Sequence, residues 1–155
     1  MLEGSGSENV YQVGEVGGDN YPDLYNFPFL FHSNGDPWKE ANDYLLSLMR
    51  DRAPINRRTD DVRRRASKLL DYLLFCEDND LAWLDFSGAR PSLRPTYRYF
   101  YHLINEGTRS NQVINQYTGV VYHLYRYVSE HWHDLDMKRV DTIKQVRFIV
   151  QSAEF

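Results

Sequence analysis

The chain has little of what marks secreted, membrane-spanning or disulfide-bonded proteins. Its one cysteine, Cys76, excludes an internal disulfide and fits a reducing cytoplasm. The longest apolar runs, residues 27–31 and 69–76, are far shorter than the roughly 20 residues of a membrane span. The N-terminal residues lack the basic and apolar regions of a secretory signal. We therefore expect a cytoplasmic protein that does not interact with membranes.

Motifs of catalysis and cofactor binding are also missing from the sequence. There is no phosphate-binding glycine loop, nucleophile elbow or HExxH motif. His131 and His133 lie two residues apart, so they would point to different sides of a helix, and no second ligand pair follows them. Cys76 is expected in the core and not as a nucleophile. We expect no catalytic residue, cofactor, metal or small-molecule substrate.

The composition is that of a folded domain with one unusual segment. Hydrophobic residues make up 42% of the 155 residues and aromatic residues 15%, enough for one domain with a core. The net charge is -4, yet residues 57–68 hold six basic and two acidic residues, a local charge of +4. A basic segment in an acidic chain indicates a surface that binds a polyanion, with DNA as the leading candidate.

The first 36 residues are predicted to be non-helical. Residues 1–20 contain five of the nine glycines, which favours a flexible tail. Residues 21–36 are predicted to be an extended leader, because Pro22 and Pro28 disfavour a helix there. Three phenylalanines of the leader alternate as a strip that could lie against a domain: Phe27, Phe29 and Phe31.

Residues 37–133 are predicted to be a compact all-α domain of four helices. Asp36 is expected to cap the first helix, with Pro37 at its first position, and Thr59 to cap the second. Gly107 is expected to stop the third helix. The predicted helices cover residues 37–52, 59–77, 92–106 and 110–131.

Helical periodicity separates an apolar from a polar side in the second and fourth helices. The predicted apolar stripe of the second helix is Val62, Ala66, Leu69, Leu73 and Cys76, opposite Arg64, Ser67, Lys68 and Asp71. Arg63 and Arg65 flank this stripe and are expected to serve packing or ion pairs. The predicted apolar stripe of the fourth helix is Val113, Tyr117, Val120, Leu124 and Val128, with Asn111, Asn115, Tyr122 and Arg126 outside.

Arginines stand at the predicted starts of both helices. Arg57 and Arg58 precede the second helix, and Arg109 precedes the fourth. Helix N-termini offer a positive end and free N–H groups to phosphates, and Asn111 and Asn115 have amides that can read adenine edges. The alternative is a solvated helix surface with Asp–Arg ion pairs. Both interpretations stay open from these residues alone.

Seven tyrosines lie between Tyr97 and Tyr127. They could form a stacking platform for single-stranded nucleic acid, but packing residues whose hydroxyls reach the surface are the favoured interpretation. Tyr122 is the exception, because it lies on the outer side of its helix with Asn115 and Arg126.

Three segments carry a family pattern: RRTDDVRRRASKLLDYLLF, DNDLAWLDF and PTYRYFYHLINEGTRSNQVINQYTGVVYHLYRYV. Together they resemble the N-terminal core-binding domain of the tyrosine recombinase (phage integrase) family, a SAM-like helical fold. The earlier segment FLFHSNGDPWKEANDYLLSLM resembles the leader and first helix of some members. The resemblance covers residues 27–133.

The resemblance implies a domain that contacts one side of a recombination-site duplex, in a bacterium or a mobile element. It implies a first contact surface of Arg57, Arg58, Arg64 and Lys68, and a second of Arg109, Asn111, Asn115 and Arg126, to which we add Tyr122. Other recombinase protomers on the same DNA would be the protein partners.

In that family, strand exchange requires a separate C-terminal catalytic domain. This chain alone is therefore not expected to be an enzyme, and residues 134–155 are expected to begin the connection to that domain. The apolar run 146–150 within them could be a strand or a helix. An HxxR sequence at 123–126 matches a family motif in spelling, but it lies inside the fourth helix and we interpret it as a coincidence.

The alternative function is a helical protein-interaction or dimerisation domain that does not bind DNA. In that case residues 21–31 and the basic helix starts would contact another protein. Salt-sensitive binding to duplex DNA would favour the first function, and dimerisation that depends on residues 27–31 would favour the second.

Overall fold

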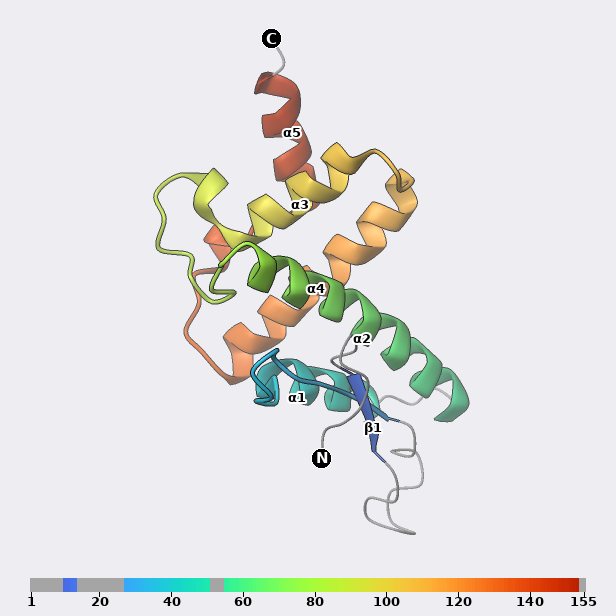
Figure 1. The fold of residues 1–155 in the computed structure, drawn as a ribbon. Helices are drawn as coiled ribbons and strands as arrows, with labels where there is room; N and C mark the ends of the chain where they lie inside the picture. Colours follow the sequence, from blue (N-terminus) through green and yellow to red (C-terminus); the bar gives the residue numbers. More distant parts are fainter. Residues whose placement is uncertain (1–9, 14–26, 51–54, 154–155) are drawn as a thin grey trace. The chain divides into compact units, whose positions relative to one another are not determined.

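The computed structural model describes residues 10–13, 27–50 and 55–153, with side chains for residues 27–50 and 59–151. The described chain is mostly helical and has one pair of short strands (Figure 1). The strands are β1 (Val10–Val13) and β2 (Phe27–Leu30). The helices are α1 (Lys39–Leu48), α2 (Ile55–Asp78), α3 (Pro95–Glu106), α4 (Asn111–His131) and α5 (Ile143–Ala153), with 3-10 turns η3 (Pro91–Leu93) and η4 (Met137–Arg139). The predicted helical class is confirmed: the described part of residues 37–133 holds four α-helices, as predicted, and α5 lies in the segment 134–155.

The chain divides into two compact units, Met1–Asp71 and Tyr72–Phe155. The boundary falls inside α2, so most of α2 belongs to the first unit and its last residues belong to the second. Because α2 is continuous across this boundary, no loop or linker separates the two units at this point of the sequence.

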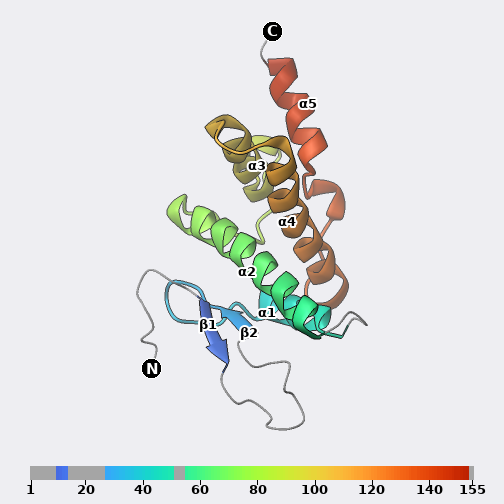
Figure 2. The ribbon, with the colours of Figure 1, turned by 90° about the vertical axis from the view of Figure 1, so that its right-hand side faces the viewer.

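In the first unit, β1 and β2 pair antiparallel beside α1, with Val10 opposite Leu30 and Val13 opposite Phe27 (Figure 2). Asn42 of α1 holds β2 in place. The Leu30 N–H donates to Asn42 Oδ1 at 2.7 Å, and Asn42 Nδ2 donates to the Leu30 carbonyl at 3.0 Å. These two bonds allow the polar Asn42 side chain to be buried. Other fully buried side chains of this unit are Trp38, Ala41, Leu45, Val62 and Leu69.

The N-terminal predictions are corrected in two respects. Val10–Val13 are a strand and not part of a flexible tail, because their backbone pairs with β2. The other residues of the predicted tail, and residues 21–26 of the leader, lie outside the described residues. Phe27–Leu30 are extended as predicted, but their burial does not alternate, since Pro28 is buried with Phe27 and Leu30.

The start of α1 also differs from the prediction. Lys39 is the first helical residue, two positions after Pro37, which forms a β-bridge with Phe31 instead. The Asp36 N–H donates to Asn34 Oδ1 at 2.9 Å, and the Asp36 carboxylate accepts from Asn34 Nδ2 at 3.2 Å. Asp36 therefore closes the preceding turn and does not cap the helix.

α2 begins at Ile55, about one turn before the predicted cap Thr59. No glycine or proline lies between these two residues, so nothing in the sequence stops the helix from extending backwards. Arg57 and Arg58 are therefore inside α2 and not before it.

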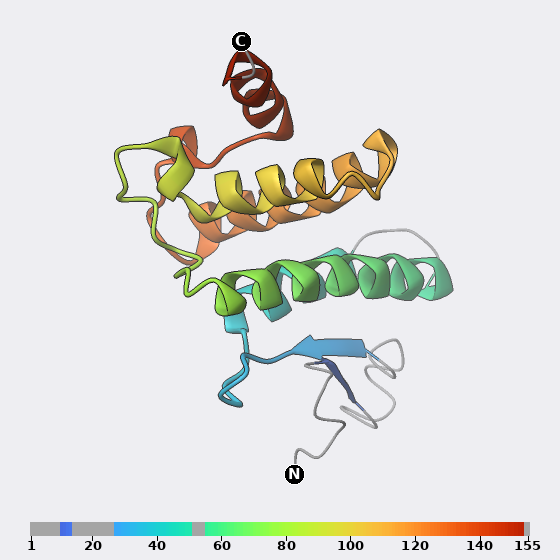
Figure 3. The same cartoon turned by 45° about the horizontal axis from the view of Figure 1, so that its top comes forward.

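In the second unit, α3 and α4 lie side by side as an antiparallel pair (Figure 3). α3 begins at Pro95, three residues later than predicted, because residues 91–93 form η3. It ends at Gly107, whose φ of 70° is favourable for glycine. The Ser110 hydroxyl accepts a hydrogen bond from the Val113 N–H at 3.2 Å and caps α4. The predicted glycine stop and the predicted start near Ser110 are confirmed.

Buried tyrosines form much of the core of the second unit. The hydroxyls of Tyr72 and Tyr125 are 2.6 Å apart, and the Tyr125 hydroxyl donates to the Trp83 carbonyl at 2.5 Å. Burial raises the pKa of Tyr72 and of Tyr125 well above the usual value, so both hydroxyls keep their protons. Tyr125 and Tyr99 therefore serve packing as predicted, but the expectation that the hydroxyls reach the surface is wrong for Tyr125, whose hydroxyl is bonded inside the core.

The last described residues pack on α3 and α4. Asp141 accepts hydrogen bonds from Arg94 at 3.1 Å and from the Thr96 hydroxyl at 2.8 Å, and Arg139 donates to the Phe86 carbonyl at 2.9 Å. Residues 146–150, left open between strand and helix, belong to α5. The segment predicted to be a connection is therefore part of the second unit, and a link to a further domain stays a prediction.

Candidate nucleic-acid interface

The predicted two-sided character of α2 is confirmed. Val62, Ala66, Leu69, Leu73 and Cys76 are all buried. On the opposite side Arg64 and Ser67 are exposed, and Lys68 and Asp71 are half-buried. Arg63 is exposed as well, contrary to the packing role expected for it. We call Arg63, Arg64 and Lys68 the α2 cationic surface.

Arg64 and Lys68 share one side of the helix because they are four residues apart. The Lys68 ammonium donates to the Arg64 carbonyl at 3.5 Å, which leaves its charge near the surface. Arg57 and Arg58 lie on the same helix, but their side chains are outside the described residues.

Arg65 has an internal role, as its position beside the apolar stripe predicts. Its Nε donates to Asp61 Oδ2 at 3.0 Å, and its Nη1 donates to the Tyr44 hydroxyl at 3.1 Å. Burial raises the pKa of Tyr44, so the hydroxyl stays neutral and accepts this bond. Arg65 therefore joins α2 to α1 within the first unit.

The second predicted surface starts with Arg109, which has partners inside the protein. Its guanidinium pairs with the Glu106 carboxylate and lies 5.0 Å from the centre of the Tyr117 ring. Glu106 compensates the charge of Arg109, so this arginine offers less charge to a phosphate than the sequence predicts.

Asn111 is also engaged, with a residue that was not among the predicted contacts. Its Oδ1 accepts a hydrogen bond from Arg147 Nη2 of α5 at 3.1 Å. Arg147 comes from a segment whose secondary structure was open from the sequence, so no sequence signal placed it beside the start of α4. It adds a cation next to Asn111.

The rest of the second surface lies along α4. Asn115 and Arg126 are exposed as predicted, whereas Tyr122 is half-buried. The buried side of α4 is wider than the predicted stripe and includes Ile114, Thr118, Val121 and Tyr125. Val113 and Tyr117, which were predicted inside it, are half-buried.

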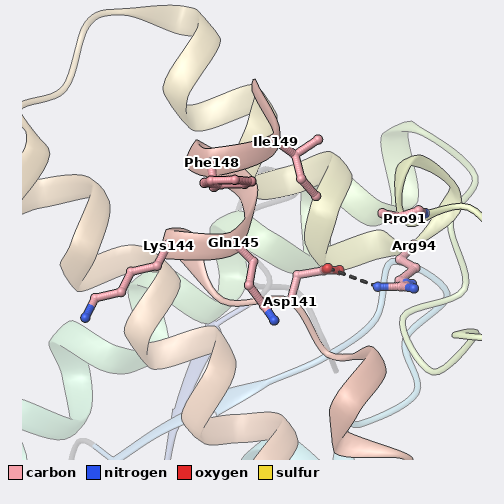
Figure 4. A pocket seen from close by; sticks show the side chains of 7 residues that line it. All are labelled: Pro91, Arg94, Asp141, Lys144, Gln145, Phe148 and Ile149. Atoms are coloured by element: carbon pink, nitrogen blue, oxygen red, sulfur yellow. Dashed lines mark hydrogen bonds and ion pairs between the residues drawn. The ribbon is translucent and has the colours of Figure 1, made fainter. Parts of the chain in front are cut away.

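A cleft beside α5 is a further feature of the second unit (Figure 4). Asp141 and Arg94 are joined by an ion pair at one side of it, and Lys144 and Gln145 line it. The ring of Phe148 also lines the cleft and is 70% exposed. Asp141 compensates Arg94, so the charge that remains in the lining is that of Lys144, and the cleft has less positive charge to offer a polyanion than the α2 cationic surface.

Metal sites and membrane-spanning helices can be assessed for residues 10–13, 27–50 and 55–153. No three His, Cys, Asp or Glu residues in this part of the chain come together in a way that could hold a metal ion. None of its helices is both long and apolar enough to cross a membrane.

Known proteins provide no second source of identification. Models of protein families, curated proteins and solved structures give no match to this chain. The functional assignment therefore depends on the residues of the two surfaces and on the sequence pattern.

Proposed function

We propose that this chain is the DNA-binding part of a site-specific tyrosine recombinase, with a SAM-like core-binding fold. The α2 cationic surface is the observation that supports this most. Arg64 is exposed on the side of α2 opposite a fully buried stripe, and Arg63, which flanks that stripe, is exposed as well. Cations held on a rigid helix can neutralise backbone phosphates of duplex DNA and release their counterions.

In this proposal the second surface contributes mainly amide groups. Asn115 is exposed on α4 and could reach base edges, and Arg126 is exposed about three turns further along the same helix. Arg109 contributes less, because Glu106 compensates its charge. Strand exchange would take place in a separate catalytic domain, and other protomers of the recombinase would bind the same DNA.

Charge reversal on α2 tests the proposal. The double variant Arg64→Glu, Lys68→Glu and the wild type would be titrated with a fluorescein-labelled duplex, and anisotropy would be followed over a series of salt concentrations. We expect wild-type binding to weaken with salt, and the double variant to bind on the order of tenfold more weakly with a shallower salt dependence.

Lys144→Glu is the matched control. Lys144 is an exposed cation of α5 outside both predicted surfaces. Its substitution by glutamate changes the net charge as much as either single substitution on α2 does. The control reverses one cation and the α2 variant reverses two, so equal losses per reversed cation would show that only net charge matters. Absence of salt-dependent binding by the wild type would refute DNA binding.

A protein-interaction function is the second candidate. The prediction that residues 21–31 contact another protein has less support, because Phe27 and Leu30 are buried in the first unit. Phe148 and Leu93, 70% and 55% exposed, are the apolar side chains in the second unit that favour it. Light scattering of the wild type and of Phe148→Asp would reveal a dimer that depends on Phe148, and its loss with duplex binding unchanged would show that contact to be separate from DNA binding.

A further inference from the structure

A second cleft of the second unit is lined largely by aromatic and amide side chains. Phe75 is in the last turn of α2 and Asn79 directly follows that helix. The other lining residues used below come from α3: Tyr97, Arg98, Tyr101, His102 and Asn105. None of them belongs to either predicted duplex-binding surface. The cleft therefore has a composition and a location of its own.

The aromatic side chains are arranged in two contacting pairs. The rings of Tyr97 and Tyr101 are 6.3 Å apart and meet edge to face, since the two residues are one helical turn apart. The ring of Phe75 lies 5.0 Å from that of His102 with an angle of 34° between them. Tyr101 is 38% exposed, so its ring is accessible to a planar ligand.

Polar groups of the cleft suit the edge of a nucleobase. Asn105 is exposed, and Asn79, whose Nδ2 donates to the Phe75 carbonyl at 2.8 Å, is exposed beside it in the same cleft. Amide side chains can both donate to and accept from the edges of unpaired bases. Aromatic rings with a few polar groups are the usual composition of sites that bind unpaired bases.

The charges around the cleft exclude a long run of phosphates. Arg98 is the exposed cation of its lining, and Asp78 and Asp80 are exposed on either side of Asn79. These carboxylates would repel a duplex backbone, whereas one phosphate next to Arg98 could be accommodated. A single unpaired nucleotide fits this balance better than duplex DNA.

We propose that this cleft binds an unpaired nucleotide of single-stranded nucleic acid, by stacking its base on Tyr101 and placing one phosphate near Arg98. The site goes beyond the proposed function, because it uses a different surface and a different form of nucleic acid. A single-stranded segment next to a bound duplex would be such a ligand in either DNA or RNA.

Binding of a labelled thymidine octamer measures the affinity of the site. Tyr101→Ala should weaken binding by about tenfold, within the range found when one stacking side chain is removed, and Tyr101→Phe should retain it. Phe148→Ala removes an exposed ring outside the cleft and should leave affinity unchanged. Arg98→Ala should lower the slope of log affinity against log salt by about 0.7, as for one phosphate of a single strand.

Photo-crosslinking locates the ligand. An octamer with one 5-iodouracil would be irradiated on the full chain, and crosslinked peptides would be identified by mass spectrometry. Crosslinks at Tyr97 or Tyr101 would support the proposal, and crosslinks confined to the α2 cationic surface would overturn it. Equal affinity of Tyr101→Ala and wild type, with unchanged circular dichroism, would also overturn it.

A parallel series with a deoxyuridine octamer and a uridine octamer, which differ only in the 2′-hydroxyl, separates the two sources of such a ligand. Tighter binding of the deoxy octamer would assign the site to DNA, and tighter binding of the ribo octamer would assign it to RNA. Duplex titration of the same variants keeps the two proposals distinguishable. Tyr101→Ala should affect the octamer alone, and loss of duplex binding in the α2 variants would be a separate result.

Discussion

Four arginines of the second unit are held by neighbouring groups, whereas Arg63 and Arg64 on α2 of the first unit are exposed. The held arginines and their partners are Arg94 with Asp141, Arg109 with Glu106, Arg139 with the Phe86 carbonyl and Arg147 with Asn111. These four arginines thus mainly stabilise the fold, whereas Arg98 and Arg126 of the same unit are exposed. Those of the α2 cationic surface are available to a polyanion.

The same difference exists within the basic segment itself. Arg65 is one residue from Arg64 in sequence, yet it pairs with Asp61 and bonds to Tyr44. The local charge of +4 therefore overstates the charge that a phosphate backbone would meet. A helix can place neighbouring cations in opposite roles because successive residues are 100° apart around its axis.

The largest effect is expected where an arginine partner is removed from the interior. Asp141→Ala should lower the free energy of unfolding by about 3 kcal/mol, because it leaves Arg94 and Thr96 without their buried acceptor. Urea denaturation monitored by tryptophan fluorescence would measure it. A loss below about 1 kcal/mol would mean that Arg94 finds another partner or water.

The pKa of Asp141 adds a dependence on pH to this comparison. Burial raises this pKa above the usual 3.8, although Thr96 and Arg94 oppose the shift. The folded state then binds more protons than the unfolded state, so this residue's contribution to stability falls as pH rises from 3.8 through the raised pKa. Asp141→Asn should remove that fall, which denaturation at several pH values would detect as a difference from wild type.

The next effect concerns duplex binding by the two kinds of arginine. Arg64→Glu should account for most of the roughly tenfold loss of the double variant, because Arg64 is exposed and Lys68 is half-buried. Arg109→Glu should weaken binding by less than about threefold, because Glu106 already compensates Arg109. Anisotropy titrations at one salt concentration would compare them. Equal losses would show that the start of α4 contacts DNA as strongly as α2 does.

A smaller effect should follow from releasing Arg109. Glu106→Gln removes the carboxylate partner, so duplex affinity should rise by about two- to threefold if α4 faces the DNA. The same titration would measure it. Unchanged affinity would restrict the DNA contacts to the α2 cationic surface.

The smallest effect is expected for the ion pair on α2. Asp61→Ala should cost about 0.5 kcal/mol or less, because the Asp61 side chain is 48% exposed and Arg65 keeps its bond to Tyr44. Urea denaturation beside Asp141→Ala would give the ratio of the two effects. A loss as large as that of Asp141→Ala would show that Arg65 is as important to the fold as Arg94.

Periodicity and local helix signals determined much of this fold. The stripe from Val62 to Cys76, the stop at Gly107 and the cap at Ser110 follow from residue types at helical spacing, so the sequence alone predicts them. The signals failed at Asp36 and Thr59, where a turn and a continuing helix took precedence. Whether Asp36 or Thr59 caps a helix depends on the structure of the neighbouring residues and not on the residue type alone.

Contacts between distant residues were decided only by the tertiary structure. The sequence by itself determined that α2 has a basic side opposite an apolar one, because helical spacing requires it. It did not determine that Glu106 holds Arg109, that Arg147 reaches Asn111, or that Phe75 and Tyr101 line one cleft. Whether a charged or aromatic side chain is available to a ligand depends on which groups the fold brings within a few ångströms, and that proximity is set by packing.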